Sequence, residues 1–504
     1  MQTKGFKTVG QIVLGLALAA LSAVLMTLAF PPFNLWPLAW VAAVPSLVAQ
    51  YRILPRKLTS VGSAVFNGGW VLGYLGPVFA GTGNFMEYLW LYVAGISLLA
   101  DLGNRTFNER TGYRWFVLQG VAGWVGVEMI RSMLPIAGTW GFVAYTLYRQ
   151  PWLIQPVSIF GIFGMSTVIM LVNYTLGLGA VWLYDRRFST ANAGEPDANP
   201  APVPAPVMRR WLTGAGATLA AWTLLSLLLF RRATTPVVKV AAVQPDASAI
   251  IAAFSGLEDK VAALNAQMIQ QTREAAAQGA QFVVWPEGAL PFDPQVEDKL
   301  GLKSLAGETG AYLAIGYAIL SDAGLRNEAT VINPEGEFLG VFGKDHPVTF
   351  GGETSLTRGT YPVYDTPIGK LGTIICYDLD FTDTARKLAR QGAQLIAVPS
   401  NDWSAITNQH YTHIVFRAVE NRVALVKADG GFDSAIVDPY GRILALATRP
   451  ESGSATLVAD VPLGTGKALA VWLGDWIGWL SLAGLAFFAV GGGWLVKRNL
   501  PKNQ

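Results

Sequence analysis

Eight apolar stretches constrain this 504-residue chain more than any other feature of its sequence. Each comes close to the ~20 residues that a helix needs to cross a bilayer. Seven of them precede residue 231 and the last begins at residue 468. We therefore expect a multi-span α-helical membrane bundle of eight transmembrane helices with one inserted globular domain. The stretches are 8–30, 34–50, 59–80, 86–101, 115–134, 154–184, 211–230 and 468–496.

The composition agrees with a membrane protein. Apolar residues make up 52% of the chain and charged residues only 14%, whereas about a quarter of an average soluble domain is charged. The net charge of +3 is small, and no basic run is interleaved with aromatic residues, so we expect no nucleic-acid partner. A single cysteine excludes an intrachain disulfide, so the globular domain must be held together by its own core.

Lysine and arginine residues in the short loops predict the orientation of the bundle. The loops at 31–33 and 81–85 contain neither residue, whereas the opposite loops and both chain ends carry them. The positive-inside rule places the basic side in the cytoplasm. The basic residues on that side are Lys4, Lys7, Arg52, Arg56, Lys57, Arg105, Arg110, Arg114, Arg186, Arg187, Arg209, Arg210, Lys497, Arg498 and Lys502.

This orientation divides the chain into three parts. Residues 1–230 form a seven-helix transmembrane part, with a flexible cytoplasmic linker in the Pro- and Ala-rich segment 190–207. Residues 231–467 form an extracytoplasmic domain, and residues 468–504 form the last transmembrane helix and a cytoplasmic tail. The first stretch begins like a signal peptide but is longer than the apolar core of one, so we expect it to remain as an anchor.

Two charged residues lie within the fifth stretch. Glu128 and Arg131 are three residues apart, and hence on one face of a helix. Because a charge that faces lipid is costly, we expect both to face the bundle interior or the loop that follows. They form either an ion pair that orients the helix or part of a substrate site.

The globular domain alternates between strand and helix patterns. Short β-rich runs such as QFVVWPE and GTIICYD are bounded by Gly, Pro, Asn or Asp. Helical patterns occupy 257–279, 383–393 and 408–422. This alternation, together with hairpins such as INPEGEFLG, predicts an α/β sandwich with sheets inside and helices outside.

Three ionisable residues follow predicted strands in this domain. Glu287 follows FVVWP, Lys344 follows GVFG, and the single cysteine, Cys376, follows GTII. A thiol is a good nucleophile at neutral pH only when a base or a cation activates it. Glu287 would be the general base, and Lys344 would stabilise an oxyanion together with the backbone N–H of Tyr377. Taken singly, each residue has a simpler interpretation as a buried structural cysteine or a solvated charge.

Together, these motifs resemble the nitrilase superfamily of carbon-nitrogen hydrolases. FVVWPEGALP is similar to its glutamate motif, GKDHPVTFGGE to its lysine motif and GTIICYDLDF to its cysteine motif, in the same order. VPSNDW, HIVFRAVENR and DPYGRIL resemble the segments that follow the cysteine. The resemblance implies a four-layer αββα sandwich, no cofactor, and a catalytic set of Glu287, Lys344 and Cys376, supported by Glu353, Tyr377 and Asp378.

Nearly the whole chain resembles one branch of that superfamily, the apolipoprotein N-acyltransferases. Apolar stretches surround the domain, and GVEMIRSMLPIAGTWGFVAYT is similar to that family's Glu-and-Arg helix and aromatic loop. The resemblance implies that Cys376 takes an acyl chain from the sn-1 ester of a phospholipid as a thioester. The α-amine of the N-terminal diacylglyceryl-cysteine of an apolipoprotein then accepts it. The expected partners are a phospholipid donor, an apolipoprotein acceptor and the lipid bilayer, at a bacterial plasma (inner) membrane.

Two other functions fit parts of the sequence. A membrane-tethered amidase or nitrilase would hydrolyse a small amide or nitrile, although eight spans exceed what an anchor needs. A catalytically inactive, lipoprotein-binding scaffold would keep the fold, although the intact Glu, Lys and Cys set argues against it. His410 and His413 are three residues apart and His346 lies elsewhere in the sequence, with no third ligand in a recognisable motif, so we expect structural roles and no metal site.

Overall fold

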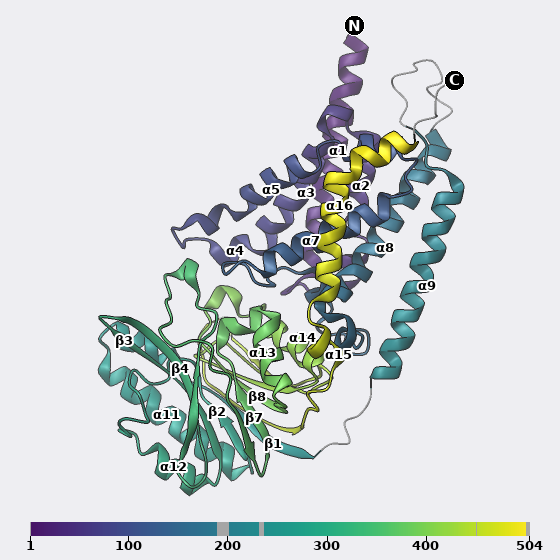
Figure 1. Cartoon of the computed structure of the whole chain (residues 1–504). Helices are drawn as coiled ribbons and strands as arrows, with labels where there is room; N and C mark the ends of the chain where they lie inside the picture. Colours follow the sequence, from purple (N-terminus) through teal and green to yellow (C-terminus); the bar gives the residue numbers. More distant parts are fainter. Residues whose placement is uncertain (1, 189–200, 231–235, 450, 500–504) are drawn as a thin grey trace.

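The computed structural model describes residues 2–188, 201–230, 236–449 and 451–499, which form a helical bundle and an α/β domain beside it (Figure 1). Most of the predicted linker at 190–207 lies outside the described residues. The predicted domain helices are confirmed as α11 (Glu258–Ala277), α13 (Thr382–Arg390) and α14 (Tyr411–Asn421).

Long helices build the bundle. Five segments in the described part of the chain are long and apolar enough to cross a membrane, namely Thr8–Ala29, Phe85–Arg110, Val157–Phe188, Ala205–Leu229 and Trp476–Lys497. The main helices are α1 (Gln2–Ala29), α3 (Thr59–Tyr74), α5 (Leu89–Ala100), α7 (Phe116–Ser132), α8 (Val157–Phe188), α9 (Ala205–Leu229) and α16 (Trp476–Asn499). Shorter segments are α4 (Gly76–Phe79), η4 (Phe85–Tyr88), α6 (Asn104–Arg110), η5 (Val143–Leu147) and α15 (Leu469–Leu473).

The expected span at 34–50 is not one continuous helix. Three short helices replace it, η1 (Trp36–Trp40), α2 (Val44–Val48) and η2 (Ala49–Ile53), with η3 (Arg56–Leu58) before α3. Pro37 and Pro45 stand in the first turns of η1 and α2. A proline has no N–H to donate and is tolerated in a first turn but not within a helix. The two prolines therefore divide a stretch whose apolarity alone suggested a single helix.

Two six-stranded sheets form the centre of the α/β domain. The first has the order β12-β1-β2-β3-β4-β5 and the second β11-β10-β9-β8-β7-β6. Strands β1, β2 and β3 are parallel, as are β7, β8 and β9. The strands are β1 (Val237–Gln244), β2 (Phe282–Val284), β3 (Tyr312–Ser321), β4 (Gly324–Ile332), β5 (Phe338–Gly343), β6 (Val363–Thr366), β7 (Gly369–Thr373), β8 (Leu395–Ser400), β9 (Ala424–Asp429), β10 (Asp433–Val437), β11 (Ile443–Thr448) and β12 (Ala455–Pro462).

Alternating side chains set the four layers. On β1, Val240 and Ala242 are buried between the two sheets, whereas Ala241 and Val243 pack in the cluster that contains α11 side chains. Successive residues of a strand point to opposite faces, so each sheet buries one face against the other sheet and one against helices. Helices α10 (Ala249–Phe254), α11 and α12 (Leu302–Thr309) accompany the first sheet, and α13 and α14 the second. The predicted αββα sandwich is confirmed.

The helical layer of the second sheet is continuous with the bundle. Ile414 and Val415 of α14 share one apolar cluster with Ile162 and Phe163 of α8. Glu420 of α14 accepts a hydrogen bond from the backbone N–H of Ile162 at 2.7 Å, next to a break in the helical backbone of α8. The domain is therefore packed onto the bundle rather than tethered to it.

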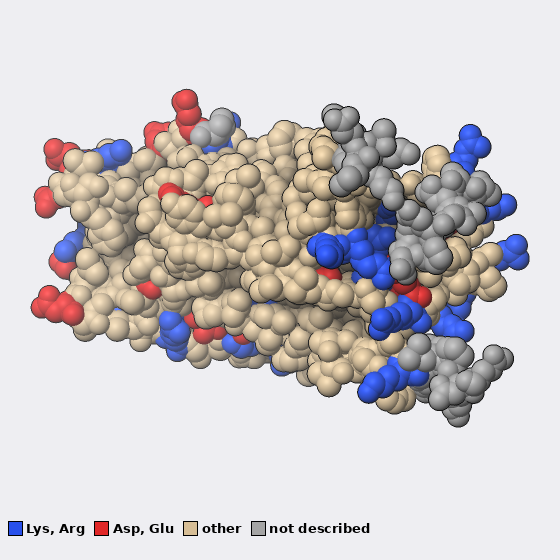
Figure 2. Space-filling view, turned by 90° about the horizontal axis from the view of Figure 1, so that it is seen from above, with Lys and Arg blue, Asp and Glu red and all other residues tan. Residues whose placement is uncertain are grey.

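Charge is distributed unevenly over the molecule. Helices α1 and α16 have their free ends at the end of the bundle away from the α/β domain (Figure 1). Seen from that end, Lys and Arg side chains gather over the bundle, and much of the remaining visible surface carries no charge (Figure 2). This is the distribution that the positive-inside rule expects of a cytoplasmic end.

Candidate active site

Cys376 stands on a sharp turn at the end of β7. The backbone N–H of Ile374 still donates to the carbonyl of Ala397 on the parallel neighbour β8, at 3.0 Å. The chain then enters a short 3-10 helix, η8 (Cys376–Asp380), and Cys376 itself has a φ of 44°. A non-glycine residue with positive φ is strained and commonly marks a functional position. The side chain is buried, so β7 is followed by a thiol held at a defined place.

The structure brings Glu287 and Lys344 together with Glu353. Lys344 Nζ lies 2.8 Å from Glu287 Oε1 and 2.8 Å from Glu353 Oε2. Asn327 on β4 donates to the same two carboxylates, at 2.6 and 2.7 Å. Glu353 therefore lies beside the other two residues, as the resemblance implies. The role of Asn327 could not be foreseen, because nothing in its sequence context distinguishes it from any asparagine in a strand.

Close backbone approach places Glu287. It follows β2, and a Cβ at Gly316 on β3 would meet the carbonyl oxygen of Pro286 at 2.4 Å and the Cα of Glu287 at 2.8 Å. Only glycine leaves room for this turn. Lys344 follows β5, and its backbone N–H donates to the carbonyl of Asn327 at 2.9 Å.

The two glutamates differ in protonation. Burial raises the pKa of Glu287, and the nearby Glu353 carboxylate raises it further, against the effect of Lys344. Burial also opposes ionisation of Glu353, but Lys344 and three hydrogen bonds hold the pKa of that carboxyl below its ordinary value. Burial would lower the pKa of Lys344, yet the two glutamates raise it. The shifts therefore favour a charged Glu353 and a charged Lys344, and make Glu287 the more easily protonated of the two carboxyls.

Asp378 braces the cysteine turn. Its Oδ2 accepts from the backbone N–H of Ile375 at 3.0 Å, and its Oδ1 accepts from the backbone N–H of His346 at 2.8 Å. The imidazole of His346 lies 3.1 Å from the same oxygen. Asp378 therefore ties the lysine motif to the cysteine motif. Tyr377 donates from its hydroxyl to the carbonyl of Pro135 at 3.2 Å.

A second carboxylate lies beside the thiol. Cys376 Sγ donates to Asp402 Oδ1 at 3.6 Å, and Asp402 also lies 2.8 Å from the imidazole of His410 and 2.8 Å from Lys427 Nζ. Burial raises the pKa of the thiol, Glu287 and Asp402 raise it further, and Lys344 lowers it. Burial disfavours a charged His410, but Asp402 and Asp380 raise the pKa of its imidazole to about 10. In the resting site the thiol is protonated and held by Asp402.

Neutralising this carboxylate should free the thiol. In Asp402→Asn the negative charge that opposes thiolate formation is gone, so the thiol pKa falls. We expect alkylation by iodoacetamide below the wild-type thiol pKa to become about tenfold faster. Asp433→Asn is the matched control, because Asp433 pairs with Lys427 and is not among the groups that shift the thiol pKa. Equal or slower alkylation in Asp402→Asn would contradict this account.

The loop after α7 docks onto the cysteine turn. The backbone N–H of Thr139 donates to the carbonyl of Asp380 at 2.8 Å, and Trp140 Nε1 donates to the Asp380 carboxylate at 2.7 Å. The Trp140 ring stacks on His410, with 5.8 Å between centroids. A bundle segment thus forms one wall of the site.

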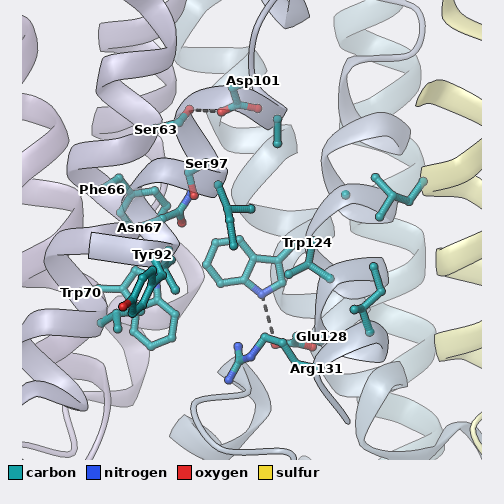
Figure 3. A pocket seen from close by; sticks show the side chains of 18 of the residues that line it. Ser63, Phe66, Asn67, Trp70, Tyr92, Ser97, Asp101, Trp124, Glu128 and Arg131 are labelled. Atoms are coloured by element: carbon teal, nitrogen blue, oxygen red, sulfur yellow. Dashed lines mark hydrogen bonds between the residues drawn. The ribbon is translucent and has the colours of Figure 1, made fainter. Parts of the chain in front are cut away.

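A cavity of about 1320 Å³ connects the thiol with the bundle. At one end it is lined by Cys376, Tyr377, Asp402, Trp403 and His410, and its other walls come from α3, α5, α7 and α16. Drug-sized ligands occupy pockets of roughly 300–1,000 Å³, so this space suits a larger apolar ligand. Figure 3 shows the bundle half of the cavity, with Trp70 and Trp124 facing it.

Glu128 and Arg131 do not pair with each other. Among the described residues, the nearest partners of Glu128 are the indole N–H of Trp124 and the backbone N–H of Val143, each at 3.1 Å. Arg131 donates to the carbonyl of Trp140 instead, and its guanidinium lies over Phe142. Both side chains line the cavity (Figure 3). The expectation of an ion pair is wrong, and both residues face the interior as the cost of a lipid-exposed charge requires.

Carboxylates engage all three histidines. His346 is paired with Asp378, His410 with Asp402, and His413 with Asp380. These are the hydrogen-bonded partners that buried imidazoles need. The His346–Asp378 and His413–Asp380 pairs join residues 32 and 33 positions apart, whereas His410 and Asp402 are eight positions apart. The structural roles expected of the three histidines stay a prediction.

Both parts of the chain match known families. The carbon-nitrogen hydrolase model matches residues 239–470, and the model of the apolipoprotein N-acyltransferase N-terminal domain matches residues 22–175. The apolipoprotein N-acyltransferase of Geobacter metallireducens is 29% identical over 521 residues, which cover 94% of each chain. That of Pseudomonas syringae pv. tomato is 25% identical over 483 residues, covering 87% of this chain and 89% of the relative.

Other relatives match a smaller share of the chain. The omega-amidase of Homo sapiens is 31% identical over 224 residues, which cover 38% of this chain and 80% of the amidase. The amidase therefore corresponds to the α/β domain, whereas the N-acyltransferases correspond to domain and bundle together. The chain belongs to the apolipoprotein N-acyltransferase family of the carbon-nitrogen hydrolase superfamily.

Proposed function

We propose that this protein transfers an acyl chain from a phospholipid to the α-amine of the N-terminal diacylglyceryl-cysteine of apolipoproteins, through a thioester on Cys376. The observation that carries the proposal is one cavity that is continuous from a buried thiol into a helical bundle. A soluble amide would need no such space, whereas a lipid substrate brings its acyl chain from the bilayer.

The first step forms the thioester. Glu287 takes the thiol proton, and the sulfur attacks the carbonyl carbon of the sn-1 ester. Lys344 and the backbone N–H of Tyr377 stabilise the oxyanion of the tetrahedral intermediate. Tyr377 lies in the first turn of η8, where N–H groups have no partner within the helix. The carbon–oxygen bond then breaks, and Glu287 returns the proton to the leaving lysophospholipid.

The second step releases the chain to the acceptor. The α-amine attacks the thioester carbonyl, Glu287 accepts a proton from the nitrogen, and the carbon–sulfur bond breaks. The proton passes to the leaving thiolate, which restores the free thiol beside Asp402. Water must stay out of the site between the two steps, because it would hydrolyse the thioester. The packing of the Thr139–Trp140 loop against η8 supports such exclusion.

The proposed topology follows from the charge distribution. Residues 1–230 and 468–504 form the membrane part, with eight crossings of which the second consists of the short helices η1, α2 and η2. Both termini face the cytoplasm and residues 231–467 face outward at the bacterial inner membrane. The thiol then lies near the outer leaflet, where a phospholipid donor and an anchored apolipoprotein can both reach it.

One assay separates this function from its alternatives. The purified full chain is incubated with phosphatidylethanolamine and a diacylated lipopeptide, and intact mass reports an acyl adduct on Cys376 and a triacylated peptide. We expect both products. Adduct followed only by free fatty acid would indicate a hydrolase, the activity that the omega-amidase likeness suggests. Neither product from a folded sample would indicate a scaffold.

A further inference from the structure

The cavity changes character along its length. Near the thiol its bundle walls are aromatic: the Trp70 and Trp124 rings stack with centroids 6.3 Å apart, and Phe66 stacks on Trp124 at 6.0 Å. Farther from the thiol, Asn67, Ser97, Ser63 and Asp101 line it (Figure 3). We call this second region the polar end, comprising Ser63, Asn67, Ser97, Asp101, Asn104 and Gln119.

The change from aromatic to polar side chains occurs on α3, α5 and α7 alike. On α3, Ser63, Asn67 and Trp70 are spaced by four and three residues, so they share a face. On α5, Ser97 is four residues before Asp101, the residue that ends the helix. On α7, Gln119 is polar whereas Trp124 is aromatic. Each helix thus becomes polar with distance from Cys376, and the arrangement belongs to the cavity rather than to one helix.

Hydrogen bonds hold the polar end together. Asp101 accepts from Ser63 and from Asn104. Gln119 donates to Asn104 at 3.0 Å and accepts from Asn108 at 2.8 Å. Polar groups at membrane depth are costly unless they are satisfied or functional. A network that spans α3, α5, α6 and α7 makes this end a fixed structural element.

The apolar part of the cavity has the length of one lipid chain. Arg131, near the thiol end, and Gln119, at the polar end, both lie on α7, twelve residues apart, which is about 18 Å of helix. The acyl chains of one leaflet span about 15 Å, half of a ~30 Å hydrocarbon core. A chain bound as a thioester on Cys376 and laid along α7 therefore extends toward the polar end, and a longer chain extends farther into it.

We propose that the polar end sets the upper length of the acyl chain that this enzyme transfers, with Asn67 and Ser97 as the residues that meet its terminal methyl group. The inference rests on the proposed acyl transfer. Each methylene is favoured while it lies against apolar walls, but one that enters the polar end covers groups that need hydrogen-bond partners. Longer chains lose affinity at that point.

The test changes the depth of the cavity in both directions. The full chain and its variants receive an equimolar mixture of phosphatidylethanolamines whose sn-1 chains run from lauroyl to arachidoyl in two-carbon steps. Mass spectrometry gives the chain distribution of the Cys376 adduct and of the triacylated peptide. Asn67→Ala should raise the share of chains longer than the wild-type optimum about tenfold. Asn67→Phe or Ser97→Phe should raise the share of shorter chains about tenfold. The burial of two methylene groups changes a binding constant by about this factor.

A matched control lies on the same helix. Leu72 of α3 is 47% exposed and does not line the cavity, so Leu72→Phe should keep the wild-type distribution. Because each distribution is a ratio within one sample, a loss of total activity does not alter it. Adducts with an unchanged distribution in all three cavity variants would overturn the length proposal while leaving acyl transfer intact. If the wild type forms no adduct, the proposed function fails instead.

Discussion

Cys376→Ala is expected to abolish the acyl adduct and to lower transfer of the acyl chain by at least about 10⁴-fold. In the proposed mechanism the thiol carries the chain covalently between the two lipids. Removing it leaves an oxyanion site with no nucleophile. Intact mass after incubation with phosphatidylethanolamine measures the adduct, and the triacylated lipopeptide measures transfer.

The alanine side chain should leave the fold almost unchanged. Cys376 is small, and its hydrogen bond to Asp402 is a long sulfur contact, so we expect a loss of about 1 kcal/mol or less in the free energy of unfolding. Cys376→Ser keeps the volume and should lose transfer as well, because a hydroxyl is far harder to ionise than a thiol. Transfer at the wild-type rate by Cys376→Ala would mean that donor and acceptor react without a thioester, and the mechanism would be wrong.

Local sequence patterns are enough to predict which strand ends carry the candidate site residues. Glu287, Lys344 and Cys376 each follow an apolar β-rich run, and parallel strands expose their carboxyl ends at one edge of a sheet. The α/β sandwich followed from the same alternation of strands and helices. These features depend on neighbours within about ten residues, which a sequence displays directly.

Long-range partners could not be predicted in this way. Asp402 lies in the downstream motif VPSNDW, whose pattern does not reveal that it accepts the hydrogen bond of the thiol. Asn327 bridges two glutamates from the middle of a strand. Helical spacing places Arg131 and Glu128 on one face, but Arg131 extends to the loop carbonyl of Trp140. In each case the partner is chosen by tertiary packing, which spacing along one element does not encode.

The broken stretch at 34–50 illustrates a different limit. Average hydropathy identified it as a span, and hydropathy does not distinguish one long helix from several short ones. Pro37 and Pro45 carried the missing information, because each begins a helical segment. A sequence window that counts backbone N–H donors as well as apolar residues would divide the stretch at 34–50 into separate helices.

Lys344→Met is expected to cause the second largest loss, about 10²–10³-fold in transfer, as when one oxyanion donor is removed. The same change leaves Glu287 and Glu353 facing each other without a cation. Like charges this close raise a carboxyl pKa, so Glu287 would stay protonated to higher pH and serve less well as a base. The thiol pKa would also rise, because Lys344 lowers it. The rate of single-turnover adduct formation, measured across a pH series, reports both effects. The lost oxyanion donor lowers the plateau of the pH–rate profile, and the raised pKa values move its acid limb to higher pH.

A second substitution separates charge balance from catalysis. Breaking a buried ion pair costs about 3–5 kcal/mol in stability, and Lys344→Met combined with Glu353→Gln removes one charge of each sign. The double variant should regain much of the free energy of unfolding, measured by chemical denaturation, but not the rate. Lys303→Met, on the exposed helix α12, should change neither quantity. If the double variant recovered transfer together with stability, Lys344 would serve only to neutralise the glutamates, and the oxyanion would have to be stabilised by backbone N–H groups alone.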